Sequence, residues 1–360
     1  MSSTSRPTRA FISRSALLHN LRLLRGQVHC PVMAVVKAEA YGHGPQVALL
    51  LEKAGVKSFG VATLEEALEL RALGLDGELI ILGALDERHL KLAAKHRVGI
   101  TAWNRNYLAS ARSYSLDVHL KVDTGMARLG FMPQEVPGIL ADFESGRFGR
   151  LKLSSAYTHF ACADERQDRF SKRQINEFLA LPWPAALRLH LANSAGALRY
   201  PQARQNMVRS GIFLYGALEK IHPLVTQSKA VLSFKTSVVR VAGLAKGQGV
   251  SYGHTFKAPR PMQIATLCAG YADGVPRLLS NQGSVLIQGK HCRIVGRVCM
   301  DLMMVDVTAL KNIKAGDEAT LIGNQGSASI TSNEWAQRCK TNAYEILCGI
   351  SSRVPRELVA

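Results

Sequence analysis

The stretch FGVATLEEALELRALGLDGELIILGALDERHLKLAAKHRVGITA, residues 59–102, decides the fold. Short apolar runs rich in Val and Ile alternate in it with longer stretches of helical periodicity that open with acidic residues. The apolar runs are 59–62, 79–83 and 98–102, and the helical stretches are 64–74 and 86–96. Runs of this length without strict alternation are typical of strands buried on both faces of a sheet, and Gly74 suits a helix end. The stretch therefore predicts parallel strands joined by helices.

The same alternation extends to both sides of this stretch. Eight apolar runs occupy residues 33–37, 59–62, 79–83, 98–102, 118–123, 154–160, 187–193 and 208–216. Eight strands alternating with helices over ~180–200 residues match a parallel (β/α)8 barrel of the TIM type, which we predict for residues 14–224. A doubly wound open sheet is the alternative, but no G-x-G-x-x-G follows the first run.

The pattern of predicted strands and helices changes after Leu224. Strand-like segments separated by Gly-rich turns occupy residues 231–244, 261–270, 283–298 and 300–310. One convincing helix interrupts them, around residues 332–340. We therefore predict a smaller, mainly antiparallel β domain for residues 225–360. Residues 1–13 precede the barrel, and the segment FIS at 11–13 could form a strand in either domain.

Composition excludes several classes of protein. The 360 residues are 47% hydrophobic and 20% charged, which is a globular composition and excludes a disordered or collagenous chain. No apolar run approaches the ~20 residues of a membrane helix, and no apolar stretch follows the basic N-terminus as in a secretory signal. The seven cysteines are odd in number and lack a Cys-x-x-Cys pair, which argues against a disulfide framework or a zinc site. We therefore expect a cytoplasmic protein that neither enters a membrane nor binds a metal.

The net charge is +18, because 45 Lys and Arg face 27 Asp and Glu. Such a charge suits a nucleic-acid partner, but the basic residues are spread along the chain without a block and without interleaved aromatic residues. A solvated basic surface that attracts anionic small molecules is the favoured interpretation.

Polar residues fall where barrel enzymes carry their active sites, at the carboxyl ends of the predicted strands. They are Lys37, Lys121 and Asp123 with Arg128 beyond them, His159, Asn193 and Ser194, and Arg209 followed by Gly211 and Ile212. Each alone has an ordinary explanation: a solvated lysine, an interior histidine or, for Ser194, a helix N-cap. Together they would face one mouth of the barrel, with an anion-binding pair after the last two strands. A lysine nucleophile beside a phosphate cradle suggests a Schiff base with pyridoxal 5'-phosphate.

An ordered set of motifs carries a resemblance to a known family. The motifs are AVVKAEAYGHG (34–44), KVDTGMARLGF (121–131), THFACAD (158–164), HLANSAG (190–196), MVRSGIFLYG (207–216), VSYG (250–253), GYADGVPR (270–277), GRVCMDLMMVDVT (296–308) and RVPRE (353–357). This set resembles the alanine racemases over nearly the whole chain. The resemblance implies a barrel plus a β domain, pyridoxal 5'-phosphate as cofactor, and interconversion of L- and D-alanine in bacterial D-alanine synthesis or breakdown. It also implies a head-to-tail homodimer whose active sites combine one subunit's barrel with its partner's β domain.

The resemblance also implies the catalytic roles. Lys37 would form the imine with the cofactor and, once released, act as the base for the α-hydrogen of D-alanine. Tyr252, from the partner subunit, would be the base for L-alanine. A phenol loses its proton more readily beside positive charge, which we expect His159 and Arg209 to supply through a hydrogen-bonded chain. Arg209 would also contact the pyridine nitrogen, and this nitrogen should stay unprotonated because guanidinium hardly gives up its proton.

Further residues take binding roles by the same resemblance. The cofactor phosphate would be held by Tyr41, Ser194, the amides of Gly211 and Ile212, and Tyr344, with Leu82 and Asn193 as further cofactor contacts. Arg128 would bond the cofactor's phenolic oxygen and help to bind the substrate, whose carboxylate would meet the amide of Met300 of the partner subunit. Lys121 would be carbamylated, with an ordinary Lys121–Asp123 ion pair as the alternative. Asp164, His190, Tyr271 and Arg297 would line the substrate corridor.

Four positions depart from the usual family pattern: Glu39 for Asp, Ala127 for Gly, Ser210 for Pro and Val275 for a larger residue. None removes a reacting group. Three other functions stay open from the sequence. A decarboxylase of basic amino acids usually has an acidic residue where Arg209 stands, and a non-catalytic pyridoxal phosphate carrier would leave the β domain unexplained. A nucleic-acid binder is the last alternative.

Overall fold

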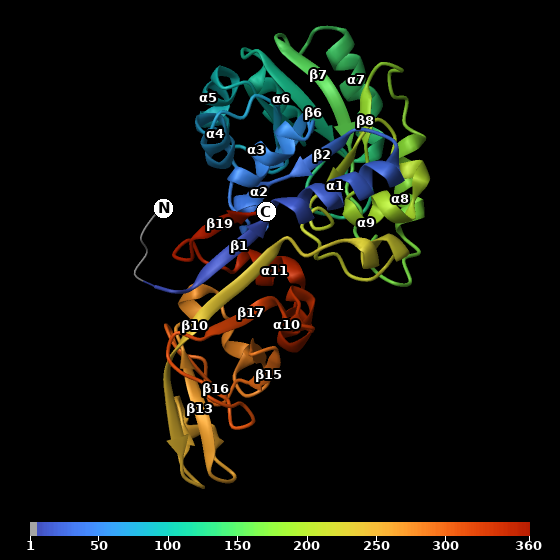
Figure 1. The fold of residues 1–360 in the computed structure, drawn as a ribbon. Coiled ribbons are helices and arrows are strands. Elements are labelled where there is room, and N and C mark those ends of the chain that lie inside the picture. The colour runs from blue at the N-terminus through green and yellow to red at the C-terminus, as the bar shows by residue number, and fades with distance from the viewer. Residues whose placement is uncertain (1–5) are drawn as a thin grey trace. The chain divides into compact units, whose positions relative to one another are not determined.

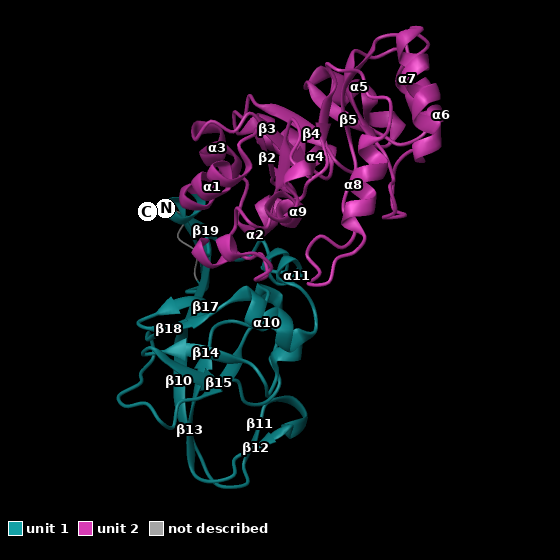
Figure 2. Cartoon of the chain, turned by 90° about the vertical axis from the view of Figure 1, so that its right-hand side faces the viewer, with its two compact units in different colours: residues 1–17, 229–360 teal, residues 18–228 magenta. Residues whose placement is uncertain are grey.

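The computed structural model describes residues 6–360 and divides them into two compact units. Unit 2 comprises residues 18–228, and unit 1 comprises residues 229–360 together with the chain up to residue 17 (Figure 2). We had placed the boundaries after residues 13 and 224. Residues 1–5, part of the segment for which we considered a strand, lie outside the described residues.

Unit 2 is a barrel of eight parallel strands, as predicted (Figure 1). The strands are β2 (Val32–Val35), β3 (Ser58–Val61), β4 (Glu78–Ile81), β5 (Val98–Ala102), β6 (Leu116–Lys121), β7 (Leu151–Tyr157), β8 (Arg188–His190) and β9 (Val208–Ser210). Neighbours along the chain pair with one another, and β9 returns to pair with β2. Between β8 and β9 two backbone bonds bridge the remaining gap: Arg209 N–H donates to Ala192 at 2.9 Å, and Asn206 N–H donates to Leu189 at 3.2 Å.

Helices alternate with these strands. They are α1 (Arg14–Val28), α2 (Lys37–Gly42), α3 (Gln46–Lys53), α4 (Leu64–Ala72), α5 (Leu90–Lys95), α6 (Arg105–Ala111), α7 (Val136–Glu144), α8 (Ser171–Leu179) and α9 (Ser194–Arg199). Several strands end earlier than predicted; the run 208–216 is a strand only to Ser210. Its apolar remainder is buried in a loop, and burial alone cannot distinguish loop from strand in a sequence. Across residues 6–360, no helix combines the length and the apolar character that a membrane crossing requires.

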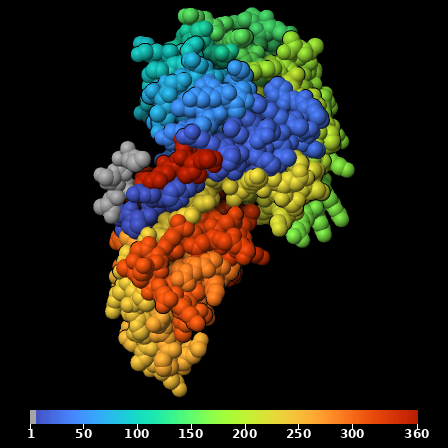
Figure 3. All heavy atoms as spheres, in the orientation of Figure 1, coloured from blue at the N-terminus to red at the C-terminus, as the bar shows by residue number. Residues whose placement is uncertain are grey.

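Unit 1 is built on a mainly antiparallel sheet, as predicted. Its strands are β1 (Arg9–Ser13), β10 (Leu232–Leu244), β13 (Met262–Leu267), β14 (Ser284–Ile287), β15 (Lys290–Arg293), β16 (Met303–Asp306), β17 (Glu318–Gln325), β18 (Ala328–Ile330) and β19 (Arg356–Val359), and a separate ribbon joins β11 (Gly249–Val250) to β12 (Phe256–Lys257). The long strand β10 pairs with β1, β13 and β17. The first and last strands, β1 and β19, lie side by side in the one parallel pairing of this sheet among the described residues (Figures 1 and 3).

The expectation of one helix in this region is wrong. Unit 1 contains α10 (Ser332–Cys339) and also α11 (Ala343–Cys348). The second helix has six residues, too few to establish a helical period in the sequence. A capping signal precedes it, since Asn342 accepts a bond from Glu345 N–H at 3.0 Å. That signal places Tyr344 on the first turn of a helix.

Candidate active site

Lys37 stands at the start of a strained turn that follows β2. The next four residues, 38–41, are all left-handed, with φ between 51° and 56°. This conformation costs an L-residue ~1–2 kcal/mol, and runs of it are rare. The carboxylate of Glu66 holds the turn in place, because one oxygen accepts from Ala38 N–H at 2.7 Å and the other from Ala62 N–H at 2.7 Å. Strain of this kind concentrates at functional sites.

Hydroxyl and amide groups converge where β8 and β9 end. Ser194 Oγ accepts from the amide of Gly211 at 3.1 Å and from that of Phe213 at 3.4 Å. The Tyr41 hydroxyl faces the same point so closely that a Cβ on Gly211 would lie 2.5 Å from it, so glycine keeps this space open. Ser210 Oγ, at one of the four positions that depart from the family pattern, lies 3.2 Å from Ser194 Oγ. These donors suit an anion such as phosphate.

Asn193 takes a structural part beside this cradle. Its side chain caps α9 by accepting from Gly196 N–H at 2.9 Å. Asn193, and not Ser194, is therefore the N-cap of this helix, and the hydroxyl of Ser194 faces the loop that follows β9.

Arg209 is buried beneath this region, and its orientation is fixed by several acceptors. One terminal nitrogen donates to both Nδ1, at 2.9 Å, and the carbonyl of His190. The other donates to the carbonyls of Thr158 at 2.6 Å and Leu191 at 3.0 Å, and lies 3.3 Å from His159 Nδ1. Burial lowers the pKa of Arg209 to about 10, so the guanidinium stays charged at neutral pH. All of these bonds are made by the two terminal nitrogens of Arg209. Its Nε–H is therefore the one guanidinium donor that they do not use.

His159 is not a source of positive charge, contrary to our expectation. Burial, followed by the charges of Arg209 and Lys121, lowers its pKa well below the usual value. The imidazole is therefore neutral at physiological pH, and Nδ1 accepts from Arg209. Of the two residues, Arg209 alone brings charge, and His159 serves as a neutral hydrogen-bonding link.

Tyr157, at the end of β7, is a site residue that the sequence analysis missed. Its hydroxyl lies 2.7 Å from Thr101 Oγ1, and its ring packs between two basic side chains, 5.2 Å from Lys121 Nζ and 5.0 Å from the guanidinium carbon of Arg209. An aromatic residue inside an apolar run looks like core in a sequence. Its position at the last residue of a barrel strand is the signal that could have identified it.

The loop after β6 is organised by hydrogen bonds to Asp123 and not by a Lys121–Asp123 ion pair. Asp123 accepts from four consecutive backbone amides, residues 125–128, at 2.8–3.1 Å. These bonds lower the pKa of Asp123 although burial opposes them. Ala127 in this loop has φ 54°, so the departure from glycine there costs the fold ~1 kcal/mol. Asp123 thus shapes the loop that presents the exposed Arg128.

Lys121 itself is buried with little to neutralise it. Desolvation, then the charges of Arg209 and Arg128, lowers its pKa to about 7 against the opposing attraction of Asp123. Between that pKa and ~10.4, the unfolded chain holds a proton that the folded chain has lost, so rising pH favours folding in this window. Near neutral pH a large fraction of Lys121 is an uncharged amine.

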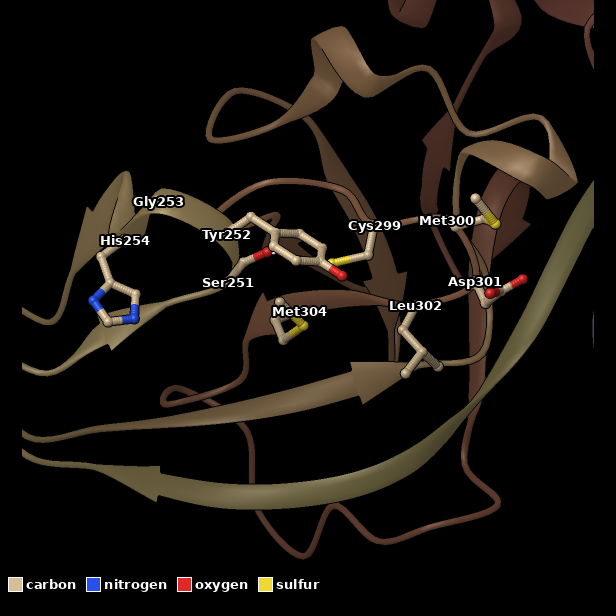
Figure 4. A pocket seen from close by; sticks show the side chains of 9 residues that line it. All are labelled: Ser251, Tyr252, Gly253, His254, Cys299, Met300, Asp301, Leu302 and Met304. Atoms are coloured by element: carbon tan, nitrogen blue, oxygen red, sulfur yellow. Dashed lines mark hydrogen bonds between the residues drawn. The ribbon is translucent and has the colours of Figure 1, made fainter.

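A second group of predicted residues surrounds a cavity in unit 1. The cavity, of about 590 Å³, is lined by Ser251, Tyr252, Gly253, His254, Cys299, Met300, Asp301, Leu302 and Met304 (Figure 4). The phenol of Tyr252 extends toward Cys299, and its side chain is 70% exposed. Two backbone bonds join the segment at Tyr271 to the loop that contains Met300. Tyr271 N–H donates to the carbonyl of Cys299 at 2.9 Å, and Ala272 N–H donates to that of Met300 at 3.0 Å. Gly270 permits this pairing, because a Cβ there would lie 2.3 Å from the Cys299 carbonyl oxygen.

The remaining predicted residues are placed as follows. Arg297 does not line the cavity, but its guanidinium packs against Gly253, which does, 3.3 Å from where a Cβ on that glycine would stand. Leu82 is half-buried after β4, and Asp164 is exposed after β7. His190 does not line an open corridor as we had expected. It is fully buried, and its ring stacks on Tyr157 at 4.9 Å beneath Arg209.

A parallel barrel joined to a separate antiparallel β unit defines the class of fold, and the comparisons name the family within it. The description "Alanine racemase, N-terminal domain" matches residues 12–219, and "Alanine racemase, C-terminal domain" matches residues 231–358. The chain belongs to the alanine racemase family of isomerases.

Relatives and solved structures agree with this assignment. Alanine racemase from Halothermothrix orenii is 41% identical, over 98% of this chain and 97% of that protein. Alanine racemase from Symbiobacterium thermophilum is 40% identical, over 98% and 97%. The crystal structure of alanine racemase from Bacillus anthracis with bound L-Ala-P is 33% identical, has a TM-score of 0.92 and covers 100% of this chain and 96% of that one. The decarboxylase and carrier alternatives find no support in these comparisons.

Proposed function

We propose that this chain interconverts L-alanine and D-alanine with pyridoxal 5'-phosphate as its cofactor. The observation that carries the proposal is the gathering of three features in unit 2. They are a lysine at a strained turn, a cradle of hydroxyls and amides, and a buried arginine with one guanidinium donor left over. An amine, an anion site and a donor for a ring nitrogen are the groups that this cofactor requires.

The described residues fit the cofactor. Its phosphate would lie in the cradle of Tyr41, Ser194 and Gly211, where glycine keeps the space clear, with the amide of Ile212 and the hydroxyl of Ser210 as further donors. The part of Tyr344, which belongs to unit 1, stays a prediction. Leu82, after β4, and Asn193, after β8, would contact the cofactor from two other strand ends. When bound, the cofactor supplies an electron sink for the carbanion that forms as the α-hydrogen leaves.

The protein's own groups move the proton. Racemisation needs a proton carrier on each face of the substrate, and we assign these parts to the Lys37 amine and the Tyr252 phenol. Arg209 is locked by backbone carbonyls and retains its proton, so it can only donate to a ring nitrogen. The neutral His159 extends this hydrogen-bonded group.

The substrate's own charge also needs partners. We assign the alanine carboxylate to Arg128 and to the amide of Met300 of the partner subunit, and the approach path to Asp164, Tyr271 and Arg297. His190 is left out of this path because it is fully buried. Size alone discriminates weakly, since a methylene is worth ~1–3 kcal/mol, so serine is an expected slow substrate.

We further propose that the protein acts as a homodimer with shared sites. Its large exposed apolar residues include Tyr252 at 70%, Met300 at 52% and Leu302 at 39%, which line one cavity of unit 1. Exposed apolar groups gathered in this way mark contact surfaces. A partner subunit's barrel is the proposed contact. The cytoplasmic location expected from the cysteine pattern stays a prediction, as does the choice between D-alanine synthesis and breakdown.

Lys121 is the proposed site of carbamylation. Its uncharged amine can attack carbon dioxide, forming a nitrogen–carbon bond and releasing a proton to water, and the product would turn an unfavourable cation into an anion beside Arg128 and Arg209. Protein equilibrated with ¹³C-bicarbonate should show a carbamate carbon resonance that grows as pH rises through about 7. Lys121→Gln should lose it, whereas Lys152→Gln, which removes an exposed lysine of β7, should keep it. An unchanged resonance in Lys121→Gln would assign the carbamate elsewhere.

The proposed function is tested by incubating the purified protein with pyridoxal 5'-phosphate and L-alanine. Chiral chromatography should show D-alanine accumulating to a racemic mixture, and the same endpoint should be reached from D-alanine. Lysine or arginine as substrate should release no carbon dioxide. Absence of D-alanine from a protein that has bound the cofactor would refute the proposal.

A further inference from the structure

A chain of polar side chains runs through the apolar interior of the barrel below Arg209. His190 Nδ1 lies 2.9 Å from a terminal nitrogen of Arg209, and its Nε2 lies 2.9 Å from Ser155 Oγ. Ser155 Oγ in turn lies 2.7 Å from His119 Nδ1. Ser155 and both histidines are fully buried, on strands β7, β8 and β6. The proposed chemistry uses neither Ser155 nor His119.

The direction of these hydrogen bonds follows from Arg209, the group in this series whose role as a donor is fixed. A guanidinium only donates, so His190 Nδ1 must accept and carries no proton. A neutral His190 then has its proton on Nε2 and donates it to Ser155 Oγ. This fixes one tautomer of His190.

The next bond is settled by counting the groups left without a partner. If the Ser155 hydroxyl donates to His119 Nδ1, only the Nε2–H of His119 is unmatched, and no partner for this atom exists among residues 6–360. If His119 donates instead, both its Nε2 lone pair and the Ser155 proton are unmatched. Each unmatched buried polar group destabilises the fold, so the first arrangement is favoured.

Surrounding contacts support neutral histidines in this chain. Gly99 lies so close that a Cβ there would be 2.5 Å from His119 Nε2, which leaves no space for a solvating group on that side. Burial lowers the pKa of His119 to about 4, although Glu78 and Asp117 oppose the shift, and burial followed by Arg209 lowers that of His190 well below its usual value.

We propose that His119 and Ser155 are positioning residues that hold His190 in its Nε2–H tautomer, and that this tautomer fixes the orientation of Arg209. The bonds form a relay in which each group donates a hydrogen bond to the next: Arg209 to His190, His190 to Ser155, and Ser155 to His119. The other tautomer of His190 would present an N–H to the guanidinium and repel it. The effect of this orientation on catalysis rests on the proposed function, whereas the assignment of the histidine tautomers does not.

The tautomers can be read directly in the full-length protein as purified, by ¹⁵N NMR of the histidine side chains near neutral pH. Signals of His119 and His190 are assigned from His119→Gln and His190→Gln. The expected spectrum shows both as neutral rings with protonated Nε2 and bare Nδ1. A protonated Nδ1 on His190, or a cationic ring at either position, would overturn the relay whether or not the protein racemises alanine.

The positioning role is tested with Ser155→Ala against Ser171→Ala, which makes the same change at another fully buried serine of unit 2. Ser155→Ala should add the Nδ1–H tautomer to the His190 signal and lower kcat about tenfold with little change in KM, the scale of one lost hydrogen bond. Ser171→Ala should leave the His190 signal as in the unmodified protein. If Ser155→Ala also leaves it unchanged, the positioning role is wrong, even in a protein that is an active racemase.

Discussion

Lys37→Ala is expected to lower kcat for alanine racemisation by at least about 10⁴-fold, because the change removes both the group proposed to bind the cofactor covalently and one of the two proposed proton carriers. The variant should fold normally, since Lys37 lies outside the apolar core at the start of the left-handed turn. Lys53→Ala, at the exposed end of α3, is the matched control and should keep full activity. Initial rates in both directions measure the effect.

Lys37→Arg separates charge from chemistry in the same position. Arginine keeps the positive charge, but its guanidinium retains its proton and so cannot form the imine. We expect it to be as inactive as the alanine variant. A variant that recovers activity through charge alone would show that Lys37 only balances charge.

Lys121 is a second lysine that could hold the cofactor, because its pKa of about 7 gives an uncharged amine. Borohydride reduction of the cofactor-loaded protein, followed by peptide mapping, should locate the label on Lys37 and leave the peptide containing Lys121 unlabelled. Label on Lys121 would transfer the role of nucleophile to β6 and contradict the assignment.

The barrel could be predicted because burial on both faces leaves a plain signature. Runs such as 79–83 and 98–102 are apolar throughout, and their spacing requires helices between them. The strand ends were less well predicted: the run 154–160 extends beyond Tyr157, where β7 ends, because the loop that follows is also buried. An apolar run indicates that a segment is buried and not that it is a strand. Because loops at the mouth of the barrel are also buried, the runs extend past the strand ends.

The local geometry of the candidate site could not be predicted in the same way. The left-handed turn after Lys37 is formed by Ala, Glu, Ala and Tyr, none of which prefers this conformation. It depends on Glu66, which stands 29 positions later in the chain and offers no local signal. Likewise, the neutral state of His159 follows from burial among cations from other strands. These are tertiary effects that oppose local preference, as is common at functional sites.

Coexpression of Lys37→Ala with Tyr252→Phe should restore activity that neither variant has alone. If each site combines Lys37 of one subunit with the partner's Tyr252, the mixed dimer contains one intact site. Random pairing makes half of the dimers mixed, so about a quarter of the wild-type sites are recovered. A site within one chain predicts no recovery at all.

Placing both substitutions in one chain reverses the test. Mixed with an equal amount of unmodified chain, the double variant should leave about a quarter of the activity if sites are shared, since both sites of a mixed dimer are then broken. It should leave about half if each chain holds its own site. Preferential pairing of like chains would lower the activity recovered in the first experiment and raise the activity left in the second, so the share of mixed dimers is measured in both. The 70% exposure of the Tyr252 side chain favours the shared arrangement, since a proton carrier this open to water needs a partner surface to enclose it.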